Sequence, residues 1–282
     1  MQRLDGMPVA NALSKQLAAQ IMALSGKGVV PKLAVVRVGD REDDLSYEKA
    51  ILKRFSASNA AVEVIPLSDD ATQDALERTI ISLNNDVTVH GILLFRPLPR
   101  HLSEDSIKSI IASDKDVDCM GIVNTAYLFA GDKKGYPPCT PQAVIELLDF
   151  YGIDAAGKKV TIVGRSLVVG KPLAMLLLHK NATVTICHTK TADLAEECKR
   201  ADILIACAGA AKMITPDFTN HRQLVIDVGI NMKDGKLCGD VDYDAVADKV
   251  RAITPVPGGV GAITAMVLLK HTILSAINAS PQ

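Results

Sequence analysis

The chain contains no tryptophan, and aromatic residues make up only 4% of its 282 residues. It also lacks an excess of either charge, because 31 Lys and Arg residues face 32 Asp and Glu residues, for a net charge of −1. Proteins that bind a nucleic-acid backbone need a concentrated excess of basic residues. The composition therefore argues against a nucleic-acid partner and gives no sign of a partner at a membrane surface.

Long apolar runs and metal-binding patterns are missing as well. The first 17 residues lack the unbroken apolar core of a signal peptide, and the densest late apolar stretch, near Ile263, is too short for a membrane span. No CxxC or HxxxH pattern occurs among the six histidines and the six cysteines, Cys119, Cys139, Cys187, Cys198, Cys207 and Cys238. We therefore expect a cytoplasmic protein with reduced thiols and no metal site.

The residues that are present favour a large α/β core, since 48% are hydrophobic and 22% are charged. In the first half, apolar segments at 33–38, 62–67 and 90–95 are typical of buried strands. Periodic segments at 47–57 and 72–83 separate them and are typical of helices. Strands alternating with helices predict right-handed βαβ units and a parallel sheet.

The second half repeats this alternation after a strong breaker cluster. Residues 131–141, GDKKGYPPCTP, are predicted to be an interdomain linker, and a helix is expected at 142–151. A Rossmann-like, doubly wound nucleotide-binding domain is predicted from four further apolar strands, at 158–164, 183–187, 201–209 and 223–229. A final helix at 265–279 is expected to return to the first domain. The predicted domains are residues 1–138 with 265–282, and residues 139–264.

The segment VTIVGRSLVVGKP, residues 160–172, is the first candidate site. A strand ends at Gly164, a tight turn follows, and Pro172 stands where a helix would begin. Glycine allows close approach of the backbone, and the amides at a helix N-terminus can hold a phosphate. Because Ser166 occupies the second glycine position of the usual GxGxxG pattern, the segment indicates either a dinucleotide site or an ordinary strand-to-helix turn.

The residues after the second strand of this domain bear on the choice of cofactor. Dinucleotide folds that prefer NAD usually carry an acidic residue there to hold the ribose 2′-hydroxyl. Here His188, Thr189 and Lys190 follow the strand, and Arg165 follows the first glycine. Basic and hydroxyl groups suit a 2′-phosphate, so NADP is favoured over NAD. The alternative is that Arg165 and Lys190 are solvated loop charges.

Two further segments are weaker candidates. In KDVD, residues 115–118 with Asn124 nearby, a carboxylate could accept the paired N–H donors of an amino-pyrimidine, although a turn or helix cap is the commoner role. The glycine-rich loop TPVPGGVG, residues 254–261, exposes backbone amides near the predicted domain junction, where a substrate cleft is expected. A purely structural loop is the alternative there.

Taken together and in this order, the segments closely resemble the methylenetetrahydrofolate dehydrogenase/cyclohydrolase (FolD) family over the whole chain. The resemblance is carried by LDG at Leu4, VGD at Val38, SY at Ser46, PLP at Pro97, KDVD at Lys115, PPCTP at Pro137, VGRSLVVGKP at Val163, CHTKT at Cys187, ADIL at Ala201, VIDVGIN at Val225, GDVD at Gly239 and TPVPGGVG at Thr254.

The resemblance implies a homodimeric enzyme of one-carbon metabolism with a folate cleft between its two domains. Methylenetetrahydrofolate would give a hydride to NADP⁺, and in bifunctional members water then opens the methenyl cation to 10-formyltetrahydrofolate. Tyr47 would stack along the pterin and Asp118 would bind its pyrimidine ring, while Pro257, Gly258 and Gly259 would face the folate. The cofactor residues implied are Gly164, Arg165, Ser166, Val169, Gly170, His188, Thr189 and Ile230.

The chain departs from the family at two catalytic positions. Ile51 stands where the family has a lysine, one helical turn after Tyr47, and Phe95 stands where it has the glutamine that orients this lysine. We expect Arg96 to point to the opposite face of its strand, because side chains alternate. A dehydrogenase with a weak or absent cyclohydrolase step is therefore predicted. The alternatives are a fully bifunctional enzyme, with Arg54 or a water as substitute, and a non-catalytic folate- or NADP-binding protein.

Overall fold

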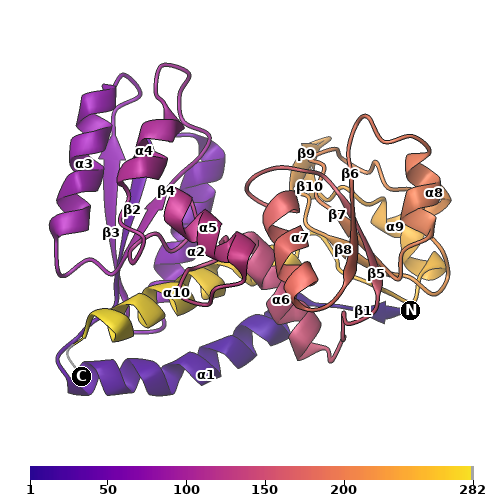
Figure 1. Ribbon diagram of the computed structural model, residues 1–282, viewed down its shortest axis with the longest axis horizontal. Coiled ribbons are helices and arrows are strands. Elements are labelled where there is room, and N and C mark those ends of the chain that lie inside the picture. Colours follow the sequence, from indigo (N-terminus) through magenta and orange to yellow (C-terminus); the bar gives the residue numbers. More distant parts are fainter. Residues whose placement is uncertain (281–282) are drawn as a thin grey trace. The chain divides into compact units, whose positions relative to one another are not determined.

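The computed structural model describes residues 1–280, and the chain divides into two compact units. The six-stranded unit comprises Met1–Asn11 and Thr140–Thr264, and the three-stranded unit comprises Ala12–Cys139 and Ala265–Gln282. Both are α/β units built on parallel sheets, which confirms the predicted fold class (Figure 1).

The three-stranded unit is built on a parallel sheet in the order β3-β2-β4. Its strands are β2 (Lys32–Val38), β3 (Ala61–Leu67) and β4 (Gly91–Leu94), so the three strands predicted in the first half are confirmed to within one residue at each end. β2 lies in the middle, and four of its seven residues in succession are buried, as expected for a strand covered on both faces.

Helices cover this sheet, and several were not predicted from the sequence. α2 begins earlier than the predicted helix, because three acidic residues occupy its first turn, where they interact favourably with the helix dipole. α1, α4 and α5 were not predicted from the sequence at all. The helices that lie wholly or mostly in this unit are α1 (Gly6–Gly26), α2 (Glu42–Ser56), α3 (Gln73–Asn85), α4 (Glu104–Ile110), α5 (Ile122–Ala130) and α10 (Thr264–Ala279).

The C-terminal helix α10 belongs to the same unit as β2–β4, as predicted (Figure 1). By length and composition alone, Val260–Ala279 is apolar enough to cross a membrane, with a mean hydropathy of 1.7, so the expectation that no segment would qualify was wrong. However, 67% of this apolar window is buried inside the protein. Its Ser275 hydroxyl also donates to the carbonyl of Asp114 at 2.8 Å. This is the pattern of a core helix.

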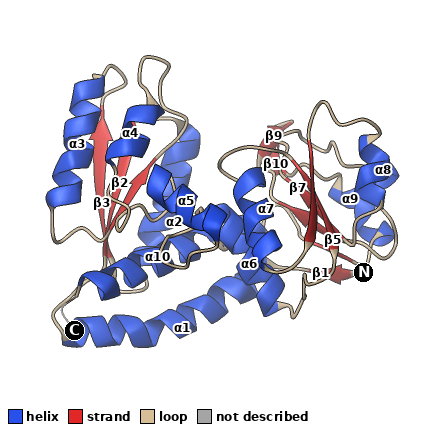
Figure 2. Ribbon diagram, viewed as in Figure 1, coloured by secondary structure: helices blue, strands red, loops and turns tan. Residues whose placement is uncertain are grey.

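The six-stranded unit contains a parallel sheet in the order β1-β11-β8-β7-β5-β6. Its strands are drawn in red in Figure 2. The strands are β1 (Gln2–Arg3), β5 (Lys159–Val163), β6 (Thr183–Cys187), β7 (Ile203–Ala206), β8 (Leu224–Asp227) and β11 (Ala252–Ile253). After β5 the chain forms β6 on one side and then crosses to form β7 on the other. This reversal is the switch point of a doubly wound fold, where such proteins bind ligands.

Shorter elements complete this unit. They are the helices α6 (Cys139–Phe150), α7 (Gly170–His179), α8 (Leu194–Lys199) and α9 (Tyr243–Val246), the antiparallel hairpin of β9 (Asn231–Lys233) and β10 (Lys236–Cys238), and three short 3₁₀ helices at Pro216–Phe218, Ala247–Lys249 and Val260–Ala262.

The predicted domain boundaries need two corrections. Met1–Asn11 was assigned to the first domain but lies in the six-stranded unit, because β1 pairs with β11 and the Gly6 N–H donates to the Gly258 carbonyl at 2.8 Å. The predicted linker at 131–141 is wrong in its last three residues, since α6 already begins at Cys139. The change of unit, between Cys139 and Thr140, therefore falls inside the first turn of a helix.

Candidate active site

The first two residues of the KDVD segment, Lys115 and Asp116, each have a separate structural task. The Lys115 ammonium donates to the carbonyls of Leu83, Asn84 and Asp86, at 3.0, 2.7 and 2.7 Å, and so satisfies the C-terminal end of α3. Asp116 is buried and accepts from the backbone N–H groups of Met120 and Gly121, both at 2.8 Å, just ahead of α5. Lys115 and Asp116 therefore act as helix caps.

Asn124, which the sequence analysis placed near this segment, supports the Asp116 cap. Its side-chain amide donates to the Asp116 carbonyl at 2.8 Å and to the Asp116 carboxylate at 3.1 Å. Burial raises the pKa of Asp116, against the opposing effect of these hydrogen bonds. Both residues are buried, so their part in the site is to hold the loop that ends at Asp118.

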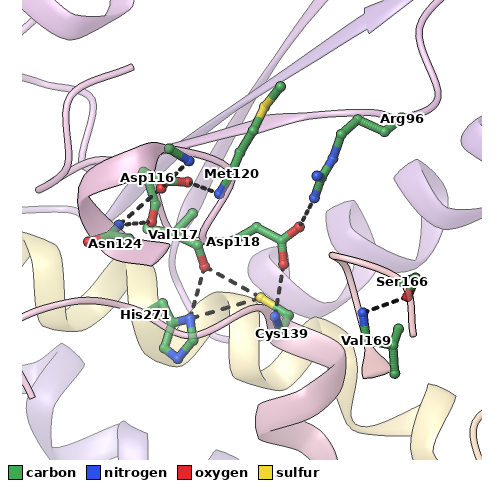
Figure 3. A network of polar contacts seen from close by, with 11 residues as sticks. Arg96, Asp116, Val117, Asp118, Met120, Asn124, Cys139, Ser166, Val169 and His271 are labelled. Carbon is green, nitrogen blue, oxygen red and sulfur yellow. Dashed lines mark hydrogen bonds and ion pairs between the residues drawn. The ribbon is translucent and has the colours of Figure 1, made fainter. Parts of the chain in front are cut away.

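The remaining two residues of KDVD, Val117 and Asp118, contact His271 of α10 and Cys139, respectively (Figure 3). Val117 is buried, and its carbonyl lies 2.9 Å from Nδ1 of His271 and 3.5 Å from the thiol of Cys139. Asp118 is the carboxylate of the segment that keeps partial exposure, at 21% of its side chain. Its Oδ1 accepts the backbone N–H of Cys139 at 2.8 Å. The fold thus offers Asp118, the residue predicted to bind the pyrimidine ring, to a ligand.

Arg96 contacts Asp118, which corrects the expectation that it would point away from the site. Its Nη2 lies 3.3 Å from Oδ2 of Asp118 (Figure 3). The expectation rested on strand alternation, but β4 ends at Leu94 and Phe95 makes the last ladder hydrogen bond, to the Val36 carbonyl at 2.9 Å. Arg96 lies beyond the strand, so alternation does not govern its direction.

Tyr47, Ile51 and Phe95 form the apolar part of this site. The Tyr47 and Phe95 rings are stacked, with centroids 5.7 Å apart and planes inclined by 30°. Ile51 follows one turn after Tyr47 on α2 and is fully buried. Phe95 is 6% exposed. The two positions at which the resemblance predicts lysine and glutamine therefore hold apolar side chains inside the protein.

The predicted nucleotide loop of the six-stranded unit follows β5 at the switch point. A Cβ added at Gly164, whose φ is +133°, would collide with the carbonyl of Cys207, which follows β7. A Cβ at Gly170 would collide with the carbonyl of Gly164. Both glycines are therefore required for close packing of the two loops and of α7, as in dinucleotide-binding turns.

Ser166 fills the place of the second glycine with a local hydrogen bond. Its Oγ accepts the backbone N–H of Val169 at 3.0 Å, at the start of α7 (Figure 3). The hydroxyl thus satisfies one of the free amides of the helix N-terminus. The other predicted cofactor residue of this loop, Arg165, is exposed.

His188 and Thr189 follow β6, beside β5 in the sheet. The N–H of Lys190 donates to Nδ1 of His188 at 3.1 Å, and the N–H of His188 donates to Oγ1 of Thr191 at 2.9 Å. Because Nδ1 is the acceptor, the neutral ring carries its proton on Nε2. Thr189 and Lys190 are exposed, and no acidic residue follows this strand before Asp193.

A cavity of about 310 Å³ in the six-stranded unit brings together residues predicted for two different ligands. Pro257, Gly258 and Gly259, predicted for the folate, line it together with Ile230, predicted for the cofactor. Gly6 was not predicted as a residue of this region, although a Cβ added there would collide with the Gly259 carbonyl. Its signal was the LDG motif, which was used for the resemblance without a structural role.

Asp227, at the end of β8, also lines this cavity. Its carboxylate accepts the backbone N–H groups of Gly229, Asp240 and Val241 at 2.9, 3.0 and 2.9 Å. Burial outweighs these hydrogen bonds and raises the pKa of Asp227 to about 6. Asp240 in turn accepts the N–H groups of residues 208–210. The two carboxylates therefore organise the loops around the cavity.

The cysteines and histidines form no cluster that could hold a metal ion in the described part of the chain. Across residues 1–280 no three His, Cys, Asp or Glu side chains come together in a way that could hold a metal ion. All six cysteines are free thiols. Burial raises the pKa of Cys119, Cys198 and Cys207 to about 12, so these thiols are poor nucleophiles.

Comparisons with known proteins agree with this arrangement. Two family models match, the tetrahydrofolate dehydrogenase/cyclohydrolase catalytic domain over residues 4–118 and the NAD(P)-binding domain over residues 138–280. The bifunctional protein FolD of Clostridioides difficile is 51% identical over 273 residues, covering 96% of this chain and 95% of that protein.

Solved structures give the same result. FolD from Campylobacter jejuni superimposes with a TM-score of 0.96 at 41% identity, covering 99% of both chains. The FolD of Trypanosoma brucei, crystallised with NADP and an inhibitor, gives a TM-score of 0.92 at 35% identity, covering 97% of this chain and 96% of that one. The resemblance inferred from the sequence is confirmed, and the chain is an enzyme that belongs to the tetrahydrofolate dehydrogenase/cyclohydrolase family.

Proposed function

We propose that this enzyme oxidises 5,10-methylenetetrahydrofolate to 5,10-methenyltetrahydrofolate with NADP⁺ and that its cyclohydrolase step is weak or lost. One observation carries the proposal. Ile51 is fully buried and Phe95 is stacked on Tyr47, at the two positions where the family has its lysine and glutamine. Neither side chain can accept or relay a proton, so general acid–base help with water attack is missing there.

Hydride transfer makes smaller demands on the protein, because it depends chiefly on holding two bound molecules in register. Asp118 would accept the N–H donors of the pyrimidine ring, and Tyr47 would stack along the pterin. The cavity supports the same function, since the proposed folate contacts Pro257–Gly259 and the proposed cofactor contact Ile230 line one space. When bound, NADP⁺ supplies the hydride acceptor.

NADP is proposed over NAD because of the groups after β5 and β6. Arg165 and Thr189 are exposed, and the acidic residue that would repel a 2′-phosphate is absent after β6. Arginine binds phosphate through charge-assisted hydrogen bonds. Gly164 and Gly170 allow the start of α7 to pack closely against the loop that follows β5.

A fully bifunctional enzyme is the second candidate, and two observations favour it. The C. difficile relative that is 51% identical is named as bifunctional. Arg54 is only partly buried, seven residues after Tyr47 on α2. A guanidinium stays protonated at neutral pH, however, so Arg54 could stabilise charge but would be a poor base. For this reason we place the monofunctional dehydrogenase first.

The oligomeric state and the cellular location of the enzyme are also proposed. A cytoplasmic homodimer is proposed from the family resemblance. The six free thiols support a reducing compartment. Sedimentation of the purified protein would measure the dimer directly, and a monomer at micromolar concentration would contradict that part of the proposal.

The deciding experiment follows reduced cofactor and methenyltetrahydrofolate by absorbance in the same reaction. Starting from methylenetetrahydrofolate and NADP⁺, we expect both products to form in equal amounts and the methenyl compound to decay no faster than in enzyme-free buffer. Formation of NADPH without accumulation of the methenyl compound would establish the bifunctional enzyme instead. No NADPH at all would leave a non-catalytic binding protein.

A further inference from the structure

Arg96 contributes a charged group at the site of Asp118 that the family resemblance does not account for. Its guanidinium lies 3.3 Å from Oδ2 of Asp118, and the two side chains are 18% and 21% exposed. They are buried enough to be held in place and open enough to meet a ligand. The opposite oxygen, Oδ1, accepts the N–H of Cys139 at 2.8 Å. Arg96, Oδ2 and Oδ1 therefore stand in a row (Figure 3).

Arg41 fixes the backbone from which Arg96 projects. It donates to the carbonyls of Pro97 and Arg96, at 3.0 and 3.2 Å, and to Asp44 at 2.9 Å. Asp44 is itself buried. These contacts tie the segment after β4 to the start of α2. The row of groups at Asp118 is therefore organised before any ligand arrives, which lowers the entropy cost of binding.

We propose that Arg96 determines specificity for the folate head group by donating a hydrogen bond to its C4 carbonyl oxygen, beside Asp118. This inference rests on the proposed function. The pyrimidine edge of tetrahydrofolate presents, in order, the C4 carbonyl as an acceptor, the N3–H as a donor and the 2-amino group as a donor. The row Arg96, Oδ2, Oδ1 presents donor, acceptor and acceptor in the matching order.

The two partners have enough hydrogen-bonding capacity for both roles. A carboxylate offers about four lone-pair sites, so Asp118 can keep its contacts with Arg96 and Cys139 and still accept two N–H groups. A guanidinium carries five N–H donors in a rigid fork, so Arg96 can bind Asp118 with one edge and a carbonyl oxygen with another. The competing reading is that Arg96 only orients Asp118 and touches no ligand.

A pair of ligands that differ at C4 separates these readings. Tetrahydrofolate carries an acceptor at C4 and a proton on N3. Its 4-amino-4-deoxy counterpart carries a donor at C4, which Arg96 cannot satisfy, and no proton on N3, so the effect of each variant is compared with the unsubstituted protein for the same ligand. Dissociation constants of both ligands would be measured by calorimetry for the unsubstituted protein and for Arg96→Met, Arg96→Lys and Arg100→Met. Arg100 is an exposed arginine four residues further on and serves as the matched control. Titration with NADPH checks that each variant retains its fold.

We expect Arg96→Met to weaken tetrahydrofolate binding by about 10- to 150-fold, the range for a hydrogen bond to a charged group. The 4-amino compound should change by less than about threefold, Arg96→Lys should restore part of the difference, and Arg100→Met should change neither ligand. Equal weakening of both ligands would show that Arg96 only orients Asp118. Unchanged binding of both ligands would show that Arg96 neither orients Asp118 nor contacts the ligand. Either result overturns the inference. If the unsubstituted protein binds NADPH but not tetrahydrofolate, the proposed function fails, and this inference with it.

Discussion

The Phe95 ring stacks on the Tyr47 ring, with 5.7 Å between their centroids. The family resemblance predicts a glutamine at the position of Phe95, where it would orient a lysine one turn after the tyrosine. Here that turn ends in Ile51, which has no exposed surface. Both Phe95 and Ile51 are therefore buried apolar side chains. A lysine or a glutamine alone at one of these buried positions would lack its polar partner, at a cost of about 1–3 kcal/mol, so we expect the two positions to change together.

The double change Ile51→Lys with Phe95→Gln is predicted to raise methenyltetrahydrofolate hydrolysis by about 10²- to 10⁴-fold, the usual value of general acid–base help. Each single change should give much less, because the lysine needs its orienting partner. The measurement is the decay of methenyl absorbance, with Ile51→Met as a volume-conserving control. Additive effects of the two single changes would contradict this reading of the site.

Asp118→Ala is predicted to raise the KM for methylenetetrahydrofolate by at least about tenfold while NADPH binding stays the same. The change removes the acceptor for the pyrimidine N–H groups and leaves Arg96 without its carboxylate. Steady-state kinetics and a separate NADPH titration check the two halves. Asp116→Ala is the contrasting variant, since the loss of this buried cap should lower the free energy of unfolding. An Asp118→Ala enzyme with unchanged folate kinetics would remove Asp118 from the site.

Arg165→Ala is predicted to weaken NADP⁺ binding by about 10- to 100-fold and to leave NAD⁺ binding unchanged, because only NADP⁺ carries the 2′-phosphate. Equilibrium titration of both cofactors measures this. Lys190→Ala, another exposed basic residue on the loop after β6, tests whether the effect depends on position or on charge alone. Tighter binding of NAD⁺ than of NADP⁺ by the unsubstituted enzyme would overturn the cofactor assignment.

Asp227 is predicted to make the free energy of unfolding fall as the pH rises from about 4 to 7. Its pKa is raised from 3.8 to about 6 in the folded protein, so the folded state holds this proton more tightly than the unfolded state does. Its contribution is fully present below pH 4 and is lost as the pH passes 6, with a size of about 3 kcal/mol.

Urea unfolding at several pH values, compared with Asp227→Asn, isolates this contribution. The variant should be less stable throughout, because its amide would face backbone N–H donors, but the difference between the two proteins should shrink as the pH rises. A difference that does not vary with pH would mean that Asp227 titrates normally.

Gly6→Ala is predicted to lower the free energy of unfolding by about 1–3 kcal/mol and to reduce kcat/KM, because its Cβ would push the Gly259 carbonyl at the cavity. Gly26→Ala, at the other end of α1, meets no atom within 4 Å and should be stabilising by up to about 1 kcal/mol. Thermal unfolding of the two variants compares them directly. Equal effects would show that the Gly6–Gly259 contact does not constrain the loop.

The sequence by itself determined the strands, the doubly wound nucleotide unit and the family. These follow from local patterns: runs such as Leu33–Val36 are apolar throughout, glycines such as Gly164 stand where a strand must turn, and the motifs keep their order. The presence of Ile51 and Phe95, where the family resemblance predicts a lysine and a glutamine, can likewise be read from position alone.

Tertiary structure decided which groups meet. Strand alternation predicted that Arg96 would point away, but β4 ends two residues earlier and Arg96 reaches Asp118, 22 positions along the chain. The sequence placed Asp116 and Asp118 in one motif, and only packing made the first a buried cap and the second an open carboxylate. Met1–Asn11 belongs to the six-stranded unit because β1 pairs with β11, about 250 residues away. Contacts at such separations depend on how the elements pack, and no local pattern encodes them.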